Sequence, residues 1–277
     1  MILVTGATGN IGSALLKELR AGGHGPVRGL TRDTARAAFP EGVEAVAGDL
    51  AEPASLKSAL AGARSLVLLS GVGSDAGVLM AARHAGVEHV VLVSSITVET
   101  HPHLGPARAN LAVERLLKES GMAWTVLRPT QFASNALLWA AVIRENGTVR
   151  APYADVALPT VHPADIASVA RVALTEPGHR ARTYAVTGPE PVSARQQVGS
   201  IAAALGREVP FTEISREQAY AQTIAVFGAE AADAVLDVTG GDANDALLAV
   251  RHTVPDVTGT PARPFRQWAA ENVTAFH

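Results

Sequence analysis

The chain has 277 residues, of which 48% are hydrophobic and 18% are charged, and its formal net charge is −3. That length is enough for one large α/β domain, or for a domain with a small appendage. The slightly acidic balance argues against a nucleic-acid partner. The absence of cysteine excludes disulfides, a thiol nucleophile and cysteine-based metal sites.

The apolar runs of the chain are short, and none reaches the roughly 18 residues that predict a membrane-spanning helix. The first predicted strand begins at Ile2, which leaves no room for a signal peptide. We therefore expect a cytoplasmic protein with no membrane partner. No group of His, Asp and Glu has metal-ligand spacing, so we expect no metal.

The first twelve residues, Met-Ile-Leu-Val-Thr-Gly-Ala-Thr-Gly-Asn-Ile-Gly, join an apolar strand to a glycine-spaced turn, and a helical pattern follows from Ser13 to Arg20. Strand, glycine turn and helix in this order form a dinucleotide phosphate site. The glycines let the backbone approach the pyrophosphate, and the positive end of the helix faces the anion. The alternative is a tight turn that binds no ligand. The context on both sides of the glycines favours the phosphate site.

The first half of the chain alternates short apolar runs with helical patterns, which is typical of a parallel sheet covered on both faces. We predict a Rossmann-like, doubly wound α/β fold, with its chemistry beyond the carboxyl ends of the strands. The expected strands are Ile2–Thr5, Val27–Thr31, Val43–Ala47, Ser65–Ser70, His89–Ser95 and Trp124–Arg128. The expected helices are Ile11–Ala21, Pro53–Leu60, Asp75–Ala85, Ala107–Ser120 and Gln131–Glu145.

After about residue 150 the pattern is less regular. We expect a dinucleotide-binding domain over 1–150 and a small, mainly helical substrate or lid region over 151–277, some of whose elements complete the sheet. The elements predicted there are a loop with a short strand over Arg150–Val161, a helix Ile166–Leu174 capped by Asp165, a strand Arg182–Val186, a helix from a Ser193 cap to Leu205, a short strand Val209–Ile214, and further helices to Phe276 with breaks at Gly240, Gly241 and Gly259.

Several segments together resemble the NmrA-like branch of the atypical short-chain dehydrogenases/reductases. They are Val4-Thr-Gly-Ala-Thr-Gly-Asn-Ile-Gly12, Val46-Ala-Gly-Asp-Leu50, Val90-Val-Leu-Val-Ser-Ser95, Leu127-Arg-Pro-Thr-Gln-Phe132, Val161-His-Pro-Ala-Asp-Ile-Ala167, Tyr184-Ala-Val-Thr-Gly-Pro-Glu190 and Phe265-Arg-Gln-Trp-Ala269. The similarity spans nearly the whole chain. It implies a Rossmann-like domain that binds NAD(P) and a small C-terminal substrate region. The family includes quinone-type reductases as well as redox-sensing regulators without enzymatic activity.

The end of the second strand predicts the cofactor. An NAD-type site places an acidic side chain here, whereas this chain has Thr31 followed by Arg32. A guanidinium fits a phosphate bidentately, so we predict NADP(H) with Arg32 on the 2′-phosphate and Arg28 as a weaker candidate. Alternatively, Arg32 lies on a solvated turn. Asp33 counts slightly against the phosphate, but it is better placed to cap a short helix.

Other cofactor contacts are expected at the ends of the following strands. The resemblance places Asp49 near the adenine, while its alternative role is to cap the next helix. The chain can pass close to the cofactor ribose at Ser70 and Gly71. The full predicted cofactor set is Gly6, Thr8, Gly9, Asn10, Ile11, Gly12, Arg32, Asp49, Leu50, Ser70, Gly71, Ser94 and Pro129.

The catalytic pair of the short-chain dehydrogenases is missing. These enzymes use a Tyr-x-x-x-Lys motif, in which the phenol transfers the proton and the lysine lowers its pKa. Alignment of the equivalent helix on Glu114 puts Pro106 at the tyrosine position and Asn110 at the lysine position. Ordinary alcohol dehydrogenation is therefore doubtful, while reduction of an acceptor that takes its proton from water, such as a quinone, remains possible.

Hydroxyl and imidazole groups near the fifth strand are the remaining candidates for catalysis. Ser94, Ser95 and Thr97 can hydrogen-bond a substrate carbonyl, or cap the strand end instead. His101 and His103 are possible proton donors, although histidines in such a loop are more often solvated. We predict Ser95, Thr97 and His103 as the catalytic set.

Four residues are expected to border the substrate: Phe132, Asn135, Tyr153 and His162. Phe132 is equally natural as a core residue. Two functions remain open, an NADPH-dependent reductase of a small carbonyl, quinone or related metabolite, and a redox-sensing NADP(H)-binding regulator of a protein partner. We favour the reductase, as a monomer or homodimer, because the cofactor half is complete and a C-terminal lid is expected.

Overall fold

The central element is a seven-stranded parallel sheet with the order β3-β2-β1-β4-β5-β6-β9. The computed structural model describes residues 1–277, apart from the side chain of Glu230. The strands are β1 (Ile2–Val4), β2 (Val27–Thr31), β3 (Val43–Ala47), β4 (Ser65–Leu69), β5 (His89–Val93), β6 (Ala123–Pro129) and β9 (Arg182–Val186). The strand order reverses between β1 and β4, which places the ligand crevice of a doubly wound sheet there. The predicted fold class is confirmed.

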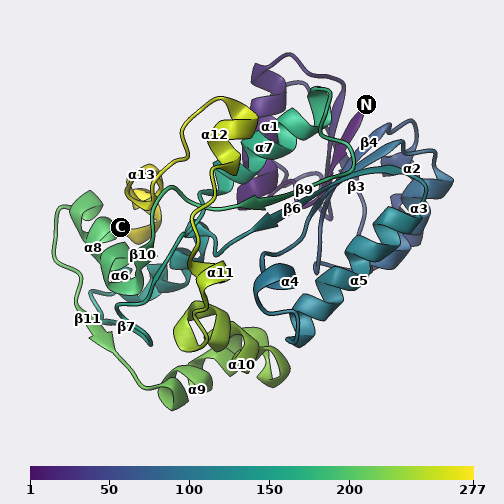
Figure 1. Cartoon of the computed structure of the whole chain (residues 1–277). Coiled ribbons are helices and arrows are strands. Elements are labelled where there is room, and N and C mark those ends of the chain that lie inside the picture. The colour runs from purple at the N-terminus through teal and green to yellow at the C-terminus, as the bar shows by residue number, and fades with distance from the viewer.

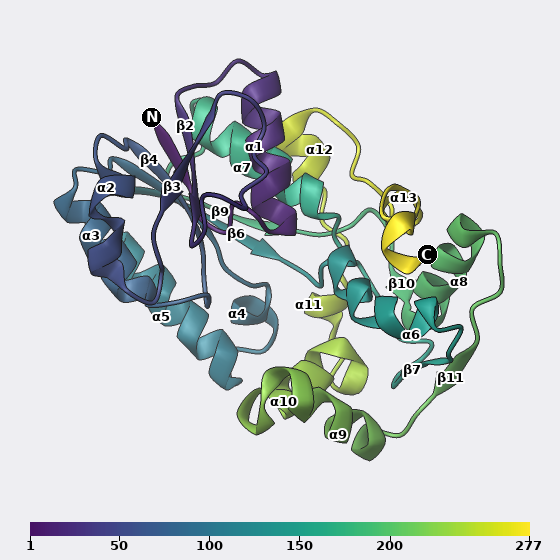
Figure 2. The ribbon, with the colours of Figure 1, turned by 180° about the vertical axis from the view of Figure 1, so that it is seen from behind.

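Helices cover both faces of this sheet (Figures 1 and 2). One face carries α1 (Asn10–Ala21), α7 (Pro163–Thr175) and α12 (Thr253–Thr258), and the other carries α2 (Lys57–Leu60), α3 (Asp75–His84) and α5 (Gly105–Glu119). Successive strand residues point to opposite faces. Val91 accordingly packs in the cluster with α1 and α7, while Leu92 packs in the cluster with α3 and α5.

The remaining elements lie beyond the carboxyl ends of the strands, and α10 contacts α5 there (Figure 2). Strand β7 pairs with β11 in parallel, and β8 pairs with β10 antiparallel. The elements of this region are α4 (Thr97–Thr100), η2 (Ala133–Trp139), α6 (Ala140–Arg144), β7 (Val149–Ala151), β8 (Ala157–Leu158), β10 (Val192–Ser193), α8 (Ala194–Leu205), β11 (Phe211–Glu213), α9 (Arg216–Phe227), α10 (Ala229–Leu236), α11 (Asp245–Leu248) and α13 (Phe265–Glu271). No helix in the described part of the chain is long and apolar enough to cross a bilayer.

Two predicted helices are each divided in the structure, and the one over Pro53–Leu60 consists of a 3₁₀ segment, η1 (Pro53–Leu56), followed by α2. The single helix expected over Gln131–Glu145 is a 3₁₀ segment, η2, followed by the short α6. Backbone pairing with Val161 keeps Gln131 and Phe132 extended, because the Val161 N–H donates to Gln131 and Val161 accepts from Ala133. By contrast, the Ser193 cap is confirmed as a capping box, and Gly206 ends α8 in the left-handed conformation.

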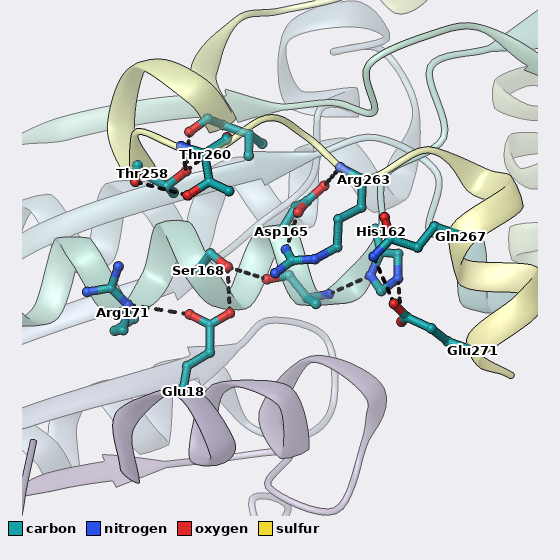
Figure 3. Close-up of polar contacts among 12 residues, drawn as sticks. Glu18, His162, Asp165, Ser168, Arg171, Thr258, Thr260, Arg263, Gln267 and Glu271 are labelled. Carbon is teal, nitrogen blue, oxygen red and sulfur yellow. Dashed lines mark hydrogen bonds and ion pairs between the residues drawn. The ribbon is translucent and has the colours of Figure 1, made fainter. Parts of the chain in front are cut away.

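The predicted cap of α7 is wrong. The helix begins at Pro163, and His162 is its N-cap, with Nδ1 accepting from the Ala164 N–H at 3.0 Å. Asp165 lies fully buried in the first turn, where it accepts from the backbone N–H of Arg263 at 2.8 Å and pairs with the Arg263 guanidinium (Figure 3). Burial raises the pKa of Asp165, and the contacts with Arg263 oppose that rise. The carboxylate therefore anchors the C-terminal segment to α7.

A second set of polar contacts joins α7 to the first helix. Glu18 of α1 accepts from the Ser168 hydroxyl and pairs with the Arg171 guanidinium at 3.4 Å (Figure 3). The helices α1 and α7 pack side by side along this line. Helix α7, although it follows residue 150, thus belongs to the same layer as α1.

Candidate functional site

The glycines of the first turn have different tasks. Gly6 has a φ of +58°, which favours glycine, and its carbonyl accepts from the Gly9 N–H at 2.9 Å. A Cβ at Gly12 would lie 2.2 Å from the Gly6 oxygen and 2.8 Å from Cα of Ala7. A Cβ at Gly9 would meet only the Gly6 oxygen, at 3.2 Å. A side chain at Gly12 is therefore excluded by the turn backbone, whereas one at Gly9 would need only a small shift of the Gly6 carbonyl.

The start of α1 is arranged for an anion. Its N-cap is Gly9, which has no side chain to accept from the first-turn N–H groups, and the first turn contains no acidic residue. The N–H groups around Asn10 and Ile11 and the positive end of the helix dipole therefore remain available to a ligand. Ile11 is buried beneath the turn and fixes its position through packing.

A crevice of about 340 Å³ lies at the carboxyl ends of β1, β2 and β3. It brings together five of the predicted cofactor residues, Gly6, Thr8, Arg32, Asp49 and Leu50. Its other lining residues are Leu30, Thr31, Asp33, Arg36, Ala37, Gly48 and Val72. Within the crevice wall, Asp49 accepts from the Ala51 N–H through Oδ1 at 2.9 Å. This bond caps a turn, whereas the N-cap of the next helix, η1 (Pro53–Leu56), is Glu52, so Asp49 does not have the helix-capping role that the sequence left open.

Two arginines border this crevice. Beside the predicted Arg32 stands Arg36, whose side chain is 90% exposed and whose Nε lies 3.5 Å from Oδ2 of Asp33. Asp33 also accepts from the Ala35 N–H at 3.0 Å, but the segment forms a turn and not the short helix that we expected. Two guanidinium groups over an open crevice suit a phosphate better than a ribose diol.

The weaker candidate, Arg28, is wrong. Its guanidinium pairs with Glu44 at 2.6 Å and donates to the carbonyl oxygens of Ser58, Ala59 and Ala61. These contacts fasten β2 to β3 and to the end of α2, outside the crevice. The sequence predicted one arginine of the crevice, Arg32. The second, Arg36, was not predicted, because it reaches the crevice only through the turn that follows Asp33.

The Ser70–Gly71 turn contains an unpaired acceptor. The Ser70 hydroxyl and the Gly71 N–H both donate to Oδ2 of Asp75, at 2.8 and 2.9 Å. The other carboxylate oxygen, Oδ1, is buried and has no partner among the described residues. Buried acceptors are rarely left unpaired, so Asp75 is under-satisfied at this turn. Asp75 is not among the residues that line the crevice, and its contacts hold the Ser70–Gly71 turn in place.

Ser94 does not face the cofactor side. It is buried at the end of β5, and its hydroxyl donates to Glu114 of α5 at 2.8 Å. Glu114 is fully buried and accepts two further bonds from the Arg128 guanidinium, at 2.9 and 2.7 Å. Burial alone would raise the pKa of Glu114, but Arg128 and Ser94 hold it below its ordinary value. The expected cofactor contact of Ser94 is therefore replaced by a structural one.

Pro129 is also not a lining residue of the crevice. It is buried at the last position of β6, and its carbonyl accepts from the Ile96 N–H at 3.0 Å. This bond holds the turn after β5 against β6.

Ser95 and Thr97 lie half-buried in a small cavity of about 130 Å³. The Thr97 N–H and hydroxyl both donate to the Ser95 oxygen, at 3.2 and 2.9 Å. With its oxygen occupied as acceptor, the Ser95 hydroxyl keeps its own proton to donate. Pro106 and Asn110, at the tyrosine and lysine positions of the missing motif, line the same cavity. The other lining residues are Leu104, Ala107, Ala234, Val235 and Val238.

The two histidines of the next loop have different environments. His101 is fully buried, with Nδ1 at 2.7 Å from the Thr100 hydroxyl and Nε2 at 2.8 Å from the Asp242 carbonyl. It therefore ties α4 to the segment after α10 and is not solvated. His103 is exposed and is not among the residues that line the Ser95 cavity. The structure does not bring this predicted catalytic residue to the others.

A larger cavity of about 280 Å³ lies under α9 and α10, and only one of the four predicted substrate residues, Tyr153, lines it. Phe132 packs against the core cluster of the sheet, which is the alternative that the sequence left open. Asn135 is exposed on η2. The prediction for His162 is wrong, because its Nε2 binds Glu271 at 3.1 Å while Nδ1 caps α7 (Figure 3). Segments that are distant in the sequence form this cavity, so no local motif predicts it.

Comparison with known proteins identifies the class. The family model described as NAD(P)H-binding matches residues 6–177, and the chain belongs to this family. The chain is 40% identical to the (4-alkanoyl-5-oxo-2,5-dihydrofuran-3-yl)methyl phosphate reductase of Streptomyces griseus, with 100% of this chain and 99% of that protein covered. It is 37% identical to the NAD(P)H azoreductase of Xenophilus azovorans, with the same coverage.

The solved structures agree with these relatives. An NADPH-dependent quinone oxidoreductase of Escherichia coli, crystallised with NADPH, superposes with a TM-score of 0.78 at 27% identity, over 99% of both chains. The full-length similarity to proteins named as reductases makes this chain an NAD(P)H-dependent oxidoreductase.

Proposed function

We propose that the chain is an NADPH-dependent reductase of a small conjugated acceptor: a quinone, or a carbonyl compound or related metabolite whose double bonds are conjugated. The cavity around Ser95 carries this proposal. It offers the hydroxyls of Ser95 and Thr97 and the amide of Asn110, while its described lining residues include neither a phenol nor an ammonium group.

Reduction of a conjugated acceptor depends less on a proton donor in the site than reduction of an isolated ketone does. Negative charge gained on reduction spreads over several atoms, and water then protonates the product. An isolated ketone becomes a strongly basic alkoxide and needs a proton donor in the site. The names of the relatives refer to a quinone, an azo compound and an alkanoyl dihydrofuranone, which are all conjugated. For a quinone, the balanced reaction consumes one NADPH and one proton and yields the hydroquinone and NADP⁺.

NADPH, when bound, supplies the two electrons and one hydrogen of the reduction. The residues described above fit its parts. The first-turn N–H groups of α1 would bind the pyrophosphate, and Arg32 and Arg36 would hold the 2′-phosphate. The exposed side chain of Val72 would offer an apolar contact to the cofactor in the crevice.

Ser95 is the residue that we assign to the acceptor oxygen. Thr97 fixes its orientation through two hydrogen bonds, so the free O–H is held ready to donate. A preorganised donor at an oxygen that gains charge is worth about 10²–10³ in rate. His103 remains a proposed proton donor only for acceptors that extend out of the cavity.

The test follows NADPH consumption by the purified protein, with the rate in the absence of protein subtracted. We expect 1,4-benzoquinone and a conjugated enone to be reduced at least tenfold faster than cyclohexanone. If no acceptor oxidises NADPH although NADPH binds, the reductase proposal is wrong. A partner protein that binds only one redox state of the cofactor complex would then support the redox-sensing alternative.

We also propose the narrower assignment to the NmrA-like branch. The segment Val161-His-Pro-Ala-Asp-Ile-Ala167 supports it, because its polar members organise the start of α7. His162 caps the helix, and Asp165 anchors the segment that leads to α13. The polar residues of this motif therefore have structural roles, and other residues are expected to bind the substrate.

A further inference from the structure

The helices α9 and α10, hereafter the lid, line the larger of two cavities, and α10 also lines the smaller one. The smaller cavity contains Ser95, and the larger one, of about 280 Å³, lies between the lid, η2, β7 and β8. Val235 of α10 lines both. We propose that the larger cavity, hereafter the tail cavity, binds an alkyl substituent of the acceptor whose conjugated head lies at Ser95. This inference rests on the proposed function and adds the substrate class, an acceptor with an apolar tail.

The lining of the tail cavity suits a neutral hydrocarbon. Aliphatic and aromatic side chains from five parts of the chain form most of it: Leu138, Trp139, Pro152, Val156, Leu158, Val192, Ala194, Ala219, Val226, Phe227, Val235 and Leu236. The hydroxyls of Thr223 and Thr239 in this wall donate to backbone carbonyls of their own helices, at 2.8 and 3.2 Å. Gln197 donates to the Thr160 hydroxyl and the Val192 carbonyl. The hydroxyls of Thr223 and Thr239 and the amide of Gln197 are thus occupied within the protein. Apart from Tyr153, the other polar lining side chains are Gln131, Gln222 and Arg150.

A charged cluster at one end of the wall is likewise paired internally. Arg216 of α9 donates to the Tyr153 hydroxyl at 3.0 Å and pairs with Asp233 and Asp237 at 3.0 and 2.9 Å. Tyr153 has a φ of +53°, and a Cβ on Gly240 would lie 2.6 Å from Cβ of Tyr153. The glycine therefore admits the phenol ring at this point. The cluster holds the lid onto the loop after β7 without presenting a free charge to the cavity.

The rim of the tail cavity exposes large apolar side chains. Leu138 is 60% exposed, Val226 58% and Phe227 48%, and all three line the cavity. Contiguous exposed apolar surface beside a hollow is a mark of a binding site. Arg150, on an exposed position of β7, is the cation among the lining residues. A tail that enters between these rim residues continues directly past Val235 to the acceptor head.

Burial of one methylene group changes affinity about fourfold. The experiment therefore measures kcat/KM for 2-alkyl-1,4-benzoquinones with methyl, propyl, pentyl and heptyl chains, at saturating NADPH. For the wild-type protein we expect kcat/KM to rise by about fourfold per methylene group until the cavity is filled. The ratio of the heptyl to the methyl compound reports the tail alone, because both share the same head.

Two variants and one control locate the tail. Val235→Trp fills the shared wall and is expected to abolish the rise with chain length. Phe227→Ser acts on an exposed rim residue, where folding is not at risk, and is expected to lower the heptyl-to-methyl ratio at least threefold. Ile224→Ser is the matched control, because Ile224 is an exposed apolar residue of the same helix that does not line the cavity. The heptyl-to-methyl ratio of Ile224→Ser should equal that of the wild type.

Three outcomes would overturn the inference. If the methyl compound is reduced but kcat/KM does not depend on chain length, the tail cavity is not used and the proposed function stands. If the dependence persists in Phe227→Ser and Val235→Trp, the tail binds elsewhere. If no quinone is reduced, the proposed function fails, and the inference fails with it.

Discussion

Removal of the Glu114 carboxylate is the sharpest test of how the site is held together. This side chain is fully buried and accepts three hydrogen bonds, two from Arg128 and one from Ser94. Glu114→Ala leaves the Arg128 guanidinium, which is 16% exposed, without its partner. Loss of one member of a buried pair costs about 3–5 kcal/mol. At about 2–4 °C per kcal/mol for a chain of this size, the midpoint of thermal unfolding falls by about 6–20 °C.

Urea unfolding provides the measurement, and Lys118→Met provides the control. Lys118 lies 3.6 Å from the same carboxylate, but its side chain is 36% exposed, so its removal costs less than about 1 kcal/mol. Arg128→Met should destabilise about as strongly as Glu114→Ala. If Glu114→Ala loses no more free energy of unfolding than Lys118→Met, the buried pair does not stabilise the fold and our reasoning is refuted.

The same variant predicts a pH dependence. The folded protein holds the pKa of Glu114 below its ordinary value, so ionisation stabilises the folded state. This contribution is fully present above the unfolded pKa of about 4.3 and is lost as the pH falls through the lower folded pKa. The difference in unfolding free energy between wild type and Glu114→Ala should therefore be constant near pH 7 and shrink in acid.

Three further predictions concern the cofactor and the reaction. Arg32→Ala should weaken NADPH binding about 10- to 100-fold while NADH binding stays unchanged, and fluorescence titration of both cofactors checks this. Gly9→Val should abolish NADPH binding with a small change in the unfolding midpoint, whereas Gly12→Val should lower that midpoint much more, because its side chain would overlap the Gly6 backbone; the opposite order would contradict the assigned roles. Ser95→Ala should lower turnover about 10²–10³-fold at equal NADPH affinity, while His103→Ala should not; a large loss in His103→Ala would make the histidine the proton donor.

The sequence predicted best those features that neighbouring residues determine. The strands are short apolar runs such as Val90 to Val93, which are buried on both faces, so their composition alone indicates them. The glycine turn is similar, because the conformation at Gly6 and the close approach at Gly12 involve only residues 6–12. Local chemistry is sufficient in both cases.

Features that depend on distant partners were missed. Aspartate is a residue type that often caps helices, which is why Asp165 was predicted as a cap. In the structure, Arg263, 98 residues further along, binds its carboxylate inside the first turn. His162 was expected at the substrate and instead binds Glu271, 109 residues away. Only the packing of α12 onto α7 and of α13 onto α8 brings these partners together, and no local pattern encodes it.

The candidate site shows the same division. Thr8 and Arg32 were found because they follow strand ends, where ligands bind in this fold. Val72 and the tail cavity were not found, because their function arises from the meeting of separate loops. Ser94 was misassigned because a hydroxyl at a strand end can turn either toward a ligand or toward the buried Glu114.

The position of β9 and α7 has a consequence for synthesis on the ribosome. The outer edge of β6 has no neighbour until Val186 has been made, and α1 lacks its companion helix until Thr175 has emerged. Asp165 also has no partner until Arg263 has been made. A nascent chain that ends near residue 150 therefore exposes an unpaired strand edge and apolar helix surface, both of which favour aggregation. The strand edge and the helix surface are covered only after the chain has been made through Val186.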